Sequence, residues 1–103
     1  MVQLSERAQG LTTRLTRRLT VKHPGGLHAR PSGAIVKTVN HFQADVIIRY
    51  SGRQADAEGI FDIMLLGVPG GAEVAVEADG PDAASVLDAI SNLFAADFGL
   101  SDN

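Results

Sequence analysis

The chain has 103 residues, of which 45% are hydrophobic and 20% charged; this is enough for one globular domain and excludes a disordered or fibrous protein. It contains no cysteine, which excludes disulfides, thiolate metal sites and a cysteine nucleophile. The net charge is −3, and the four basic and eleven acidic side chains after residue 22 argue against nucleic-acid binding.

The first 22 residues have the opposite balance, with five basic side chains and one acidic side chain. We expect residues 1–15 to form a basic, flexible arm, followed by a folded domain over residues 16–98 and a tail over residues 99–103. No apolar run approaches the roughly 20 residues that span a bilayer, and the N-terminus lacks the apolar core of a secretory signal. The sequence therefore predicts a cytoplasmic protein without stable membrane association.

The first three expected elements are a strand, a helix and a strand. Thr16–His23 alternates polar and apolar residues, as a half-buried strand does, and Pro24-Gly25-Gly26 ends it. A helix follows from Ala29, because the apolar residues after it recur at helical spacing. Asp45–Tyr50 is rich in β-branched residues and is expected to be the second strand.

A hairpin and a short helix are expected next. Ser51-Gly52 predicts a turn that folds Arg53–Ala57 back as an antiparallel strand. Ile60–Leu66 has the composition of a short helix, and Gly67 closes it.

The last two elements have the clearest patterns. After the Pro69-Gly70-Gly71 turn, strict alternation over Ala72–Ala78 predicts a strand in a sheet that is covered on one face only. The final helix is expected to begin at Pro81, with Gly80 as its cap, and to stop at Gly99. The order βαββαβα with hairpin-length links predicts a two-layer α+β domain, an antiparallel four-stranded sheet with helices on one face.

The three histidines, His23, His28 and His41, have no spacing that suits a metal site, and we expect none. His41 lies at the expected end of a helix and is predicted to be a surface residue.

His28 is different because it stands where a glycine-bearing loop becomes a helix. The first-turn amides of Ala29 and Arg30 are free to bind an anion at the positive end of the helix, and Arg30 adds a permanent cation. An imidazole at such a site is suited to carry a phosphoryl group. The same residues also fit a loop histidine that only caps a helix, and local chemistry leaves both interpretations open.

The short helix has two apolar faces. Ile63 and Leu66 share the face that is expected to reach the core, while Ile60, Phe61 and Met64 gather on the opposite face. A domain of this size does not easily bury both faces of a surface helix, so the second face is expected to dock a partner. The alternative is that this second face is also part of the core.

The string Gly25-Gly26-Leu27-His28-Ala29-Arg30-Pro31, with the elements that follow it, resembles the HPr family. These are the histidine-containing phosphocarriers of the bacterial phosphoenolpyruvate-dependent phosphotransferase system. The resemblance spans residues 16–97 and implies an open-faced sandwich with strand order 1-4-2-3. It also implies that His28 is the catalytic residue, phosphorylated on Nδ1, and that Arg30 and the amides of Ala29 and Arg30 are its phosphate partners.

The resemblance implies partners as well. In the family a phosphohistidine on Enzyme I donates the phosphoryl group, and histidines on EIIA-type sugar-specific proteins accept it. Ile60, Phe61 and Met64 match the family positions that dock these proteins. We therefore expect a monomeric, stoichiometric phosphocarrier for sugar uptake rather than a turnover enzyme, without a metal or other cofactor.

Gly59 stands where many Gram-positive relatives carry a regulatory serine, and without a hydroxyl that mode of control cannot operate at this position. Within the family, a carrier for a regulatory branch or for dihydroxyacetone kinase would use the same histidine. A small-ligand-binding regulatory module on a similar fold is the alternative from another class.

Overall fold

The computed structural model describes residues 14–100, which form a four-stranded sheet, three α-helices and a short 3₁₀ helix. The strands are β1 (Leu15–Thr20), β2 (Asp45–Tyr50), β3 (Arg53–Asp56) and β4 (Glu73–Asp79). The helices are α2 (Ala29–Val39), α3 (Ile60–Leu65) and α4 (Ala83–Ala95), followed by the 3₁₀ helix η1 (Asp97–Gly99). The predicted order βαββαβα is confirmed.

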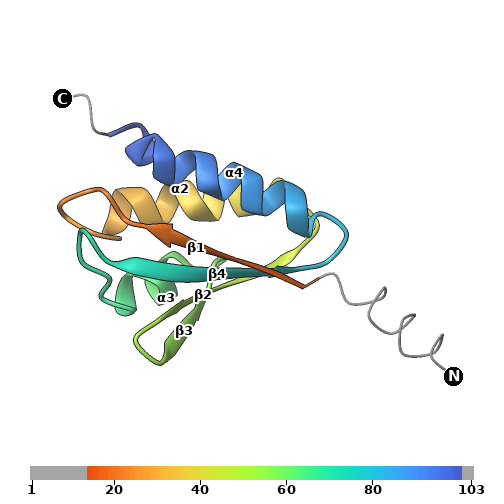
Figure 1. Ribbon diagram of the computed structural model, residues 1–103, viewed down its shortest axis with the longest axis horizontal. Helices are drawn as coiled ribbons and strands as arrows, with labels where there is room; N and C mark the ends of the chain where they lie inside the picture. The colour runs from red at the N-terminus through yellow and green to blue at the C-terminus, as the bar shows by residue number, and fades with distance from the viewer. Residues whose placement is uncertain (1–13, 101–103) are drawn as a thin grey trace, which may run out of the picture.

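The sheet has the strand order β1-β4-β2-β3, and all neighbouring strands are antiparallel. Helices α2 and α4 contact each other and cover one face of the sheet, and the other face is open (Figure 1). The expected two-layer, open-faced sandwich is therefore confirmed, including the strand order that the family resemblance implied. None of the helices within residues 14–100 is long and apolar enough to cross a membrane.

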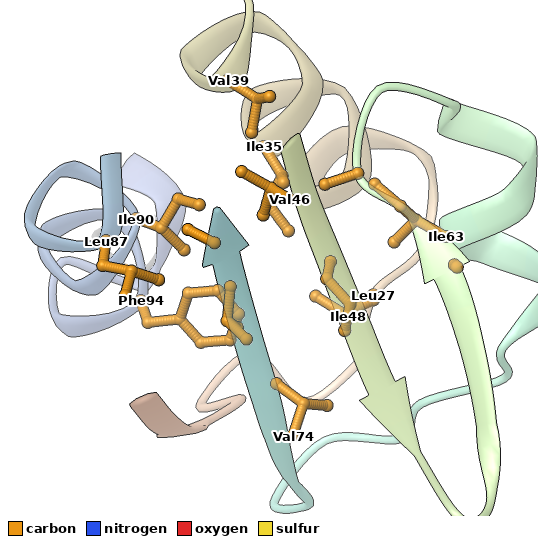
Figure 2. Packing of buried hydrophobic residues seen from close by; sticks show 14 of the residues in the cluster. Leu27, Ile35, Val39, Val46, Ile48, Ile63, Val74, Leu87, Ile90 and Phe94 are labelled. Carbon is orange, nitrogen blue, oxygen red and sulfur yellow. The ribbon is translucent and has the colours of Figure 1, made fainter. Parts of the chain in front are cut away.

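The core lies between the helices and the covered face of the sheet (Figure 2). Alternate residues of β4 are buried, as the period-two pattern of that strand predicted. Helix α4 contributes a stripe at helical spacing, and α2 contributes Ile35 and Val39. Aliphatic side chains dominate this core, and Phe94 stacks on Phe98 with ring centroids 4.8 Å apart.

The open face of the sheet carries charged side chains that pair across strands. Arg18 of β1 lies 3.5 Å from Glu73 of β4, and Arg49 of β2 lies 2.8 Å from Glu77 of β4. On the other side of β1, Arg17 reaches Asp88 of α4 at 2.8 Å. Basic residues near the start of the domain are thus matched to acidic residues of its body. Such exposed pairs contribute little to stability. Because their charges are opposite, they also create no large electrostatic field of one sign.

Three boundaries differ from the sequence prediction by more than one residue: the end of β1 and both ends of α4. Strand β1 ends at Thr20 and does not reach His23. The reason is the next residue: the Val21 N–H donates to the carbonyl oxygen of Ala72 (2.8 Å), and the Val21 carbonyl accepts from the Gly71 N–H (2.7 Å). These bonds join Val21 to the turn that precedes β4, so the regular pairing with β4 stops at Thr20.

Helix α4 begins at Ala83 with Asp82 as its N-cap, two residues later than predicted. Asp82 is bound to the backbone of Gln43, because its carboxylate accepts the Gln43 N–H (2.7 Å) and its own N–H donates to the Gln43 carbonyl (3.1 Å). Pro81 therefore lies in a turn and not in the helix. At the other end, α4 stops at Ala95, and the chain leaves in the left-handed conformation, with φ of 53° at Asp97 and 56° at Phe98.

Candidate functional site

His28 is the N-cap residue of α2, with extended backbone angles (φ −82°, ψ −163°). Its carbonyl accepts the first helical hydrogen bond, from the Ser32 N–H at 3.0 Å. Its imidazole makes no capping bond to the helix. His28 therefore caps the helix through its backbone, and its half-buried ring takes no part in the capping.

The first turn of α2 presents two unpaired amides beside this ring. Within residues 14–100, the backbone N–H groups of Ala29 and Arg30 bond to no other residue, and Pro31 has no N–H to satisfy. Both Ala29 and Arg30 are exposed. The Arg30 guanidinium forms no ion pair with an acid in the described part of the chain. Free amides, a helix N-terminus and an unpaired cation favour an anion here.

Gly25 determines which edge of the imidazole faces the protein. A Cβ atom at Gly25 would lie 2.9 Å from Cδ2 and 3.2 Å from Nε2 of His28. The Cδ2–Nε2 edge therefore packs over the bare backbone of Gly25. Nδ1 is on the other side of the ring, away from Gly25.

The loop that carries His28 is fixed by backbone contact with the turn before β4. The Leu27 N–H donates to the Val68 carbonyl oxygen at 3.0 Å. Gly26, with φ +73°, comes so close that a Cβ there would overlap the same oxygen. The buried Ser32 hydroxyl donates to the Leu27 carbonyl at 3.0 Å and links the loop to the helix. The loop that carries the His28 ring is thus bonded both to the turn before β4 and to helix α2.

A hollow of about 370 Å³ lies next to the imidazole. Its walls come from the histidine loop, the end of α3 and the turn that follows: Gly25, Leu27, His28, Met64, Gly67, Val68 and Pro69. The structure therefore brings Met64, one of the residues predicted to dock a partner, to the edge of the site.

The surface of α3 agrees in part with the prediction. Ile63 and Leu66 are buried, as expected. On the opposite face Phe61 is 73% exposed, but Met64 and Ile60 are only half-buried. Ile60 packs against α2, with its Cδ1 atom 3.6 Å from the position that a Cβ on Gly33 would occupy.

Sequence reasoning missed Leu65, which is 75% exposed and is the most exposed large apolar side chain in the described part of the chain. Its position four residues after Phe61 was the available signal, because residues at this spacing share a helix face. The exposed apolar surface of α3 is therefore Phe61 with Leu65, bordered by Ile60 and Met64.

The other two histidines lie in different settings. His41 is exposed, as predicted, and its Nδ1 is 2.9 Å from the Lys37 carbonyl oxygen. His23, to which sequence reasoning gave no role, lies against His28 with ring centroids 4.9 Å apart. Over residues 14–100, no group of three or more histidine or acidic side chains is placed to bind a metal ion.

Gly59 is the N-cap of α3, in an extended conformation (φ −111°). A Cβ there would lie 2.9 Å from an oxygen of the Asp62 carboxylate. Gly59, which the sequence analysis identified as lacking a regulatory hydroxyl, is therefore also next to the negative charge of Asp62.

Comparison with known proteins agrees with the fold. The family model described as "PTS HPr component phosphorylation site" matches residues 15–96. The phosphocarrier protein HPr of Cupriavidus necator is 38% identical over 85 residues, covering 82% of this chain and 96% of that protein. The chain belongs to the HPr family, the phosphocarriers of the phosphotransferase system.

Solved structures of the family have the same architecture. The crystal structure of HPr-C-His from Thermoanaerobacter tengcongensis superposes with a TM-score of 0.79 at 30% identity, covering 82% of this chain and 96% of that one. An HPr dimer from the same organism superposes with a TM-score of 0.67 at 32% identity, covering 79% and 93% of the two chains.

The close contact at Gly26 can be tested by a substitution. Gly26→Ala is expected to lower the free energy of unfolding by about 3 kcal/mol, because it adds an overlap with Val68 to the cost of a left-handed conformation. Gly52→Ala is the matched control: Gly52 also has positive φ (+78°) but has nothing within 4 Å of its Cβ position, so only about 1 kcal/mol is expected. Urea unfolding measures both values. Equal losses would show that the Gly26–Val68 contact does not anchor the loop.

Proposed function

We propose that this chain accepts a phosphoryl group on Nδ1 of His28 from a phosphohistidine on Enzyme I and passes it to a histidine of an EIIA-type protein. The observation that carries the proposal is the placement of the His28 imidazole beside two unpaired amides and an unpaired arginine at the N-terminus of α2. The family to which the chain belongs supports the same assignment.

The chemistry asks little of the protein besides position and charge. The lone pair on Nδ1 of His28 attacks phosphorus, the N–P bond of the donor breaks, and its electron pair returns to the donor imidazole. Transfer onward is the same step in reverse, with His28 as the leaving group. Each chain passes on the phosphoryl group that it accepts, so it acts as a stoichiometric carrier. The transfer between the two imidazoles needs no metal.

Nδ1 is the nitrogen we assign because of the orientation of the ring. The Nε2 edge faces Gly25, where the backbone limits the approach of a tetrahedral phosphoryl group. A phosphoryl group on Nδ1 lies outside this contact. The amides of Ala29 and Arg30 would then donate to its oxygens, and the Arg30 guanidinium would neutralise part of its charge.

The apolar surface of α3 gives partners a place to dock. Phe61 and Leu65 are exposed on a helix whose residue Met64 borders the hollow beside His28. A partner that covers this surface brings its own histidine close to the imidazole and excludes water from the transfer. The docking residues we propose are thus Ile60, Phe61 and Met64, as the sequence indicated, together with Leu65.

The pathway that receives the phosphate and the monomeric state both stay predictions. A relative, the HPr of Thermoanaerobacter tengcongensis, has been crystallised as a dimer.

His28→Ala is expected to abolish labelling of the chain by phosphoenolpyruvate and Enzyme I, because the variant has no imidazole at the anion site. Mass spectrometry under mildly alkaline conditions measures the added phosphate and its position. His41→Ala removes an exposed histidine elsewhere and is expected to label like the unmodified chain. Persistent labelling of His28→Ala would overturn the proposed function.

Arg30→Ala is expected to slow phosphoryl transfer about tenfold, because it removes a charge-assisted hydrogen bond to the phosphoryl oxygens. The fold is expected to be unaffected, since the side chain is exposed. Rapid-quench kinetics with phosphorylated Enzyme I give the rate. Lys37→Ala removes an exposed cation from the last turn of the same helix and serves as the control. Equal rates for the two variants would show that Arg30 does not contact the phosphate.

The double variant Phe61→Ala/Leu65→Ala is expected to weaken binding of Enzyme I about tenfold or more and to change stability little, because both side chains are exposed. Titration calorimetry and thermal unfolding measure the two effects. Leu15→Ala, at an exposed leucine on β1, is the control. A large fall in melting temperature with unchanged affinity would place the two residues in the core and not in the interface.

A further inference from the structure

A second imidazole lies against the ring of His28. The centroids of the His23 and His28 rings are 4.9 Å apart, and the ring planes are tilted by 57°. The centroid distance is within the range of interacting aromatic rings, and the pair is tilted. Neither histidine forms an ion pair with an acid in the described residues, so the two rings meet as neighbours without a carboxylate between them.

His23 is itself fixed by the backbone of the loop. Its Nδ1 accepts the Gly25 N–H at 3.1 Å, and its carbonyl accepts the Gly26 N–H at 2.9 Å. Because Nδ1 is an acceptor, the ring proton of neutral His23 is on Nε2. Both the backbone and the side chain of His23 are therefore tied to the segment that leads into His28.

The two rings share the space above Gly25. The position that a Cβ on Gly25 would occupy lies 3.2 Å from Nε2 of His28 and 3.4 Å from Nδ1 of His23. Gly25 thus lies against the Cδ2–Nε2 edge of His28, and Nδ1 of His23 lies near the same point. A half-turn of the His28 ring would exchange Nδ1 with Cδ2 and Nε2 with Cε1, which moves Nε2 toward the side of the ring that Nδ1 had occupied. The turning ring has to pass the His23 ring, whose centroid is 4.9 Å away.

We infer that His23 is a positioning residue for phosphoryl transfer: its ring keeps the His28 imidazole in the orientation that presents Nδ1 to the N-terminus of α2. This inference rests on the proposed function of His28. We assign the phosphoryl group to His28 and not to His23, because Nδ1 of His23 accepts the Gly25 N–H and the free amides lie in the turn after His28. Its effect is on which nitrogen reacts, and how fast.

The test compares the full chain with His23→Ala and His23→Phe. We expect His23→Ala to accept phosphate from phosphorylated Enzyme I about three- to tenfold more slowly, because one ring–ring contact is lost. We also expect a measurable share of the phosphate on Nε2 of His28 in this variant. Phosphorus and nitrogen NMR of the labelled protein distinguish the two isomers. His23→Phe keeps a ring next to His28 and is expected to restore both the rate and the Nδ1 product.

His41→Ala is the matched control and is expected to leave rate and isomer unchanged, since that ring is on the surface. The inference is overturned if His23→Ala reacts like the unmodified chain with phosphate on Nδ1 only, or if His23→Phe is as impaired as His23→Ala. If the unmodified chain takes no phosphate on His28, the proposed function fails. Nuclear Overhauser effects from the His28 ring, measured in the unphosphorylated proteins, then show separately whether the His28 ring changes orientation when the His23 ring is removed.

Discussion

The functional site depends on one backbone contact between two segments far apart in the chain. The loop before α2 lies directly on the turn before β4, with the Leu27 N–H bonded to the Val68 carbonyl and Gly26 too close to that oxygen to carry a side chain. This contact places the start of α2 relative to the sheet. The hollow beside Met64 follows from it, because residues of both segments form its walls.

The site uses two supports of different kinds. The N-terminus of α2 supplies backbone donors and the Arg30 guanidinium supplies charge, and these stabilise an anion wherever it comes from. The glycine at position 25 and the ring of His23 supply shape, because they limit the orientations of the His28 ring. In the function that we propose, affinity for phosphate and choice of nitrogen would thus be separate properties that depend on different groups around the imidazole.

Much of this architecture could be predicted from the sequence, because the strands and helices show short-range patterns of apolar and polar residues. The alternation in β4, the helical stripe of α4 and the proline in the first turn of α2 are local signals. The contact of Gly26 with Val68 is not local, so no pattern around the histidine indicates it. The start of α4 was misplaced for the same reason: the bonds between Asp82 and Gln43 join distant segments, and they outweigh the preference of Pro81 for a first helical position.

The phosphate site that we propose is made largely of main-chain groups and is therefore tolerant of sequence change. Ala29 would contribute only its amide, so any residue except proline could replace it without removing the donor. Natural variation at that position should therefore carry no information about phosphate affinity. Under the proposed role of His23, substitutions at positions 23 and 25 would change the orientation of the His28 ring and leave the first-turn amides of α2 in place.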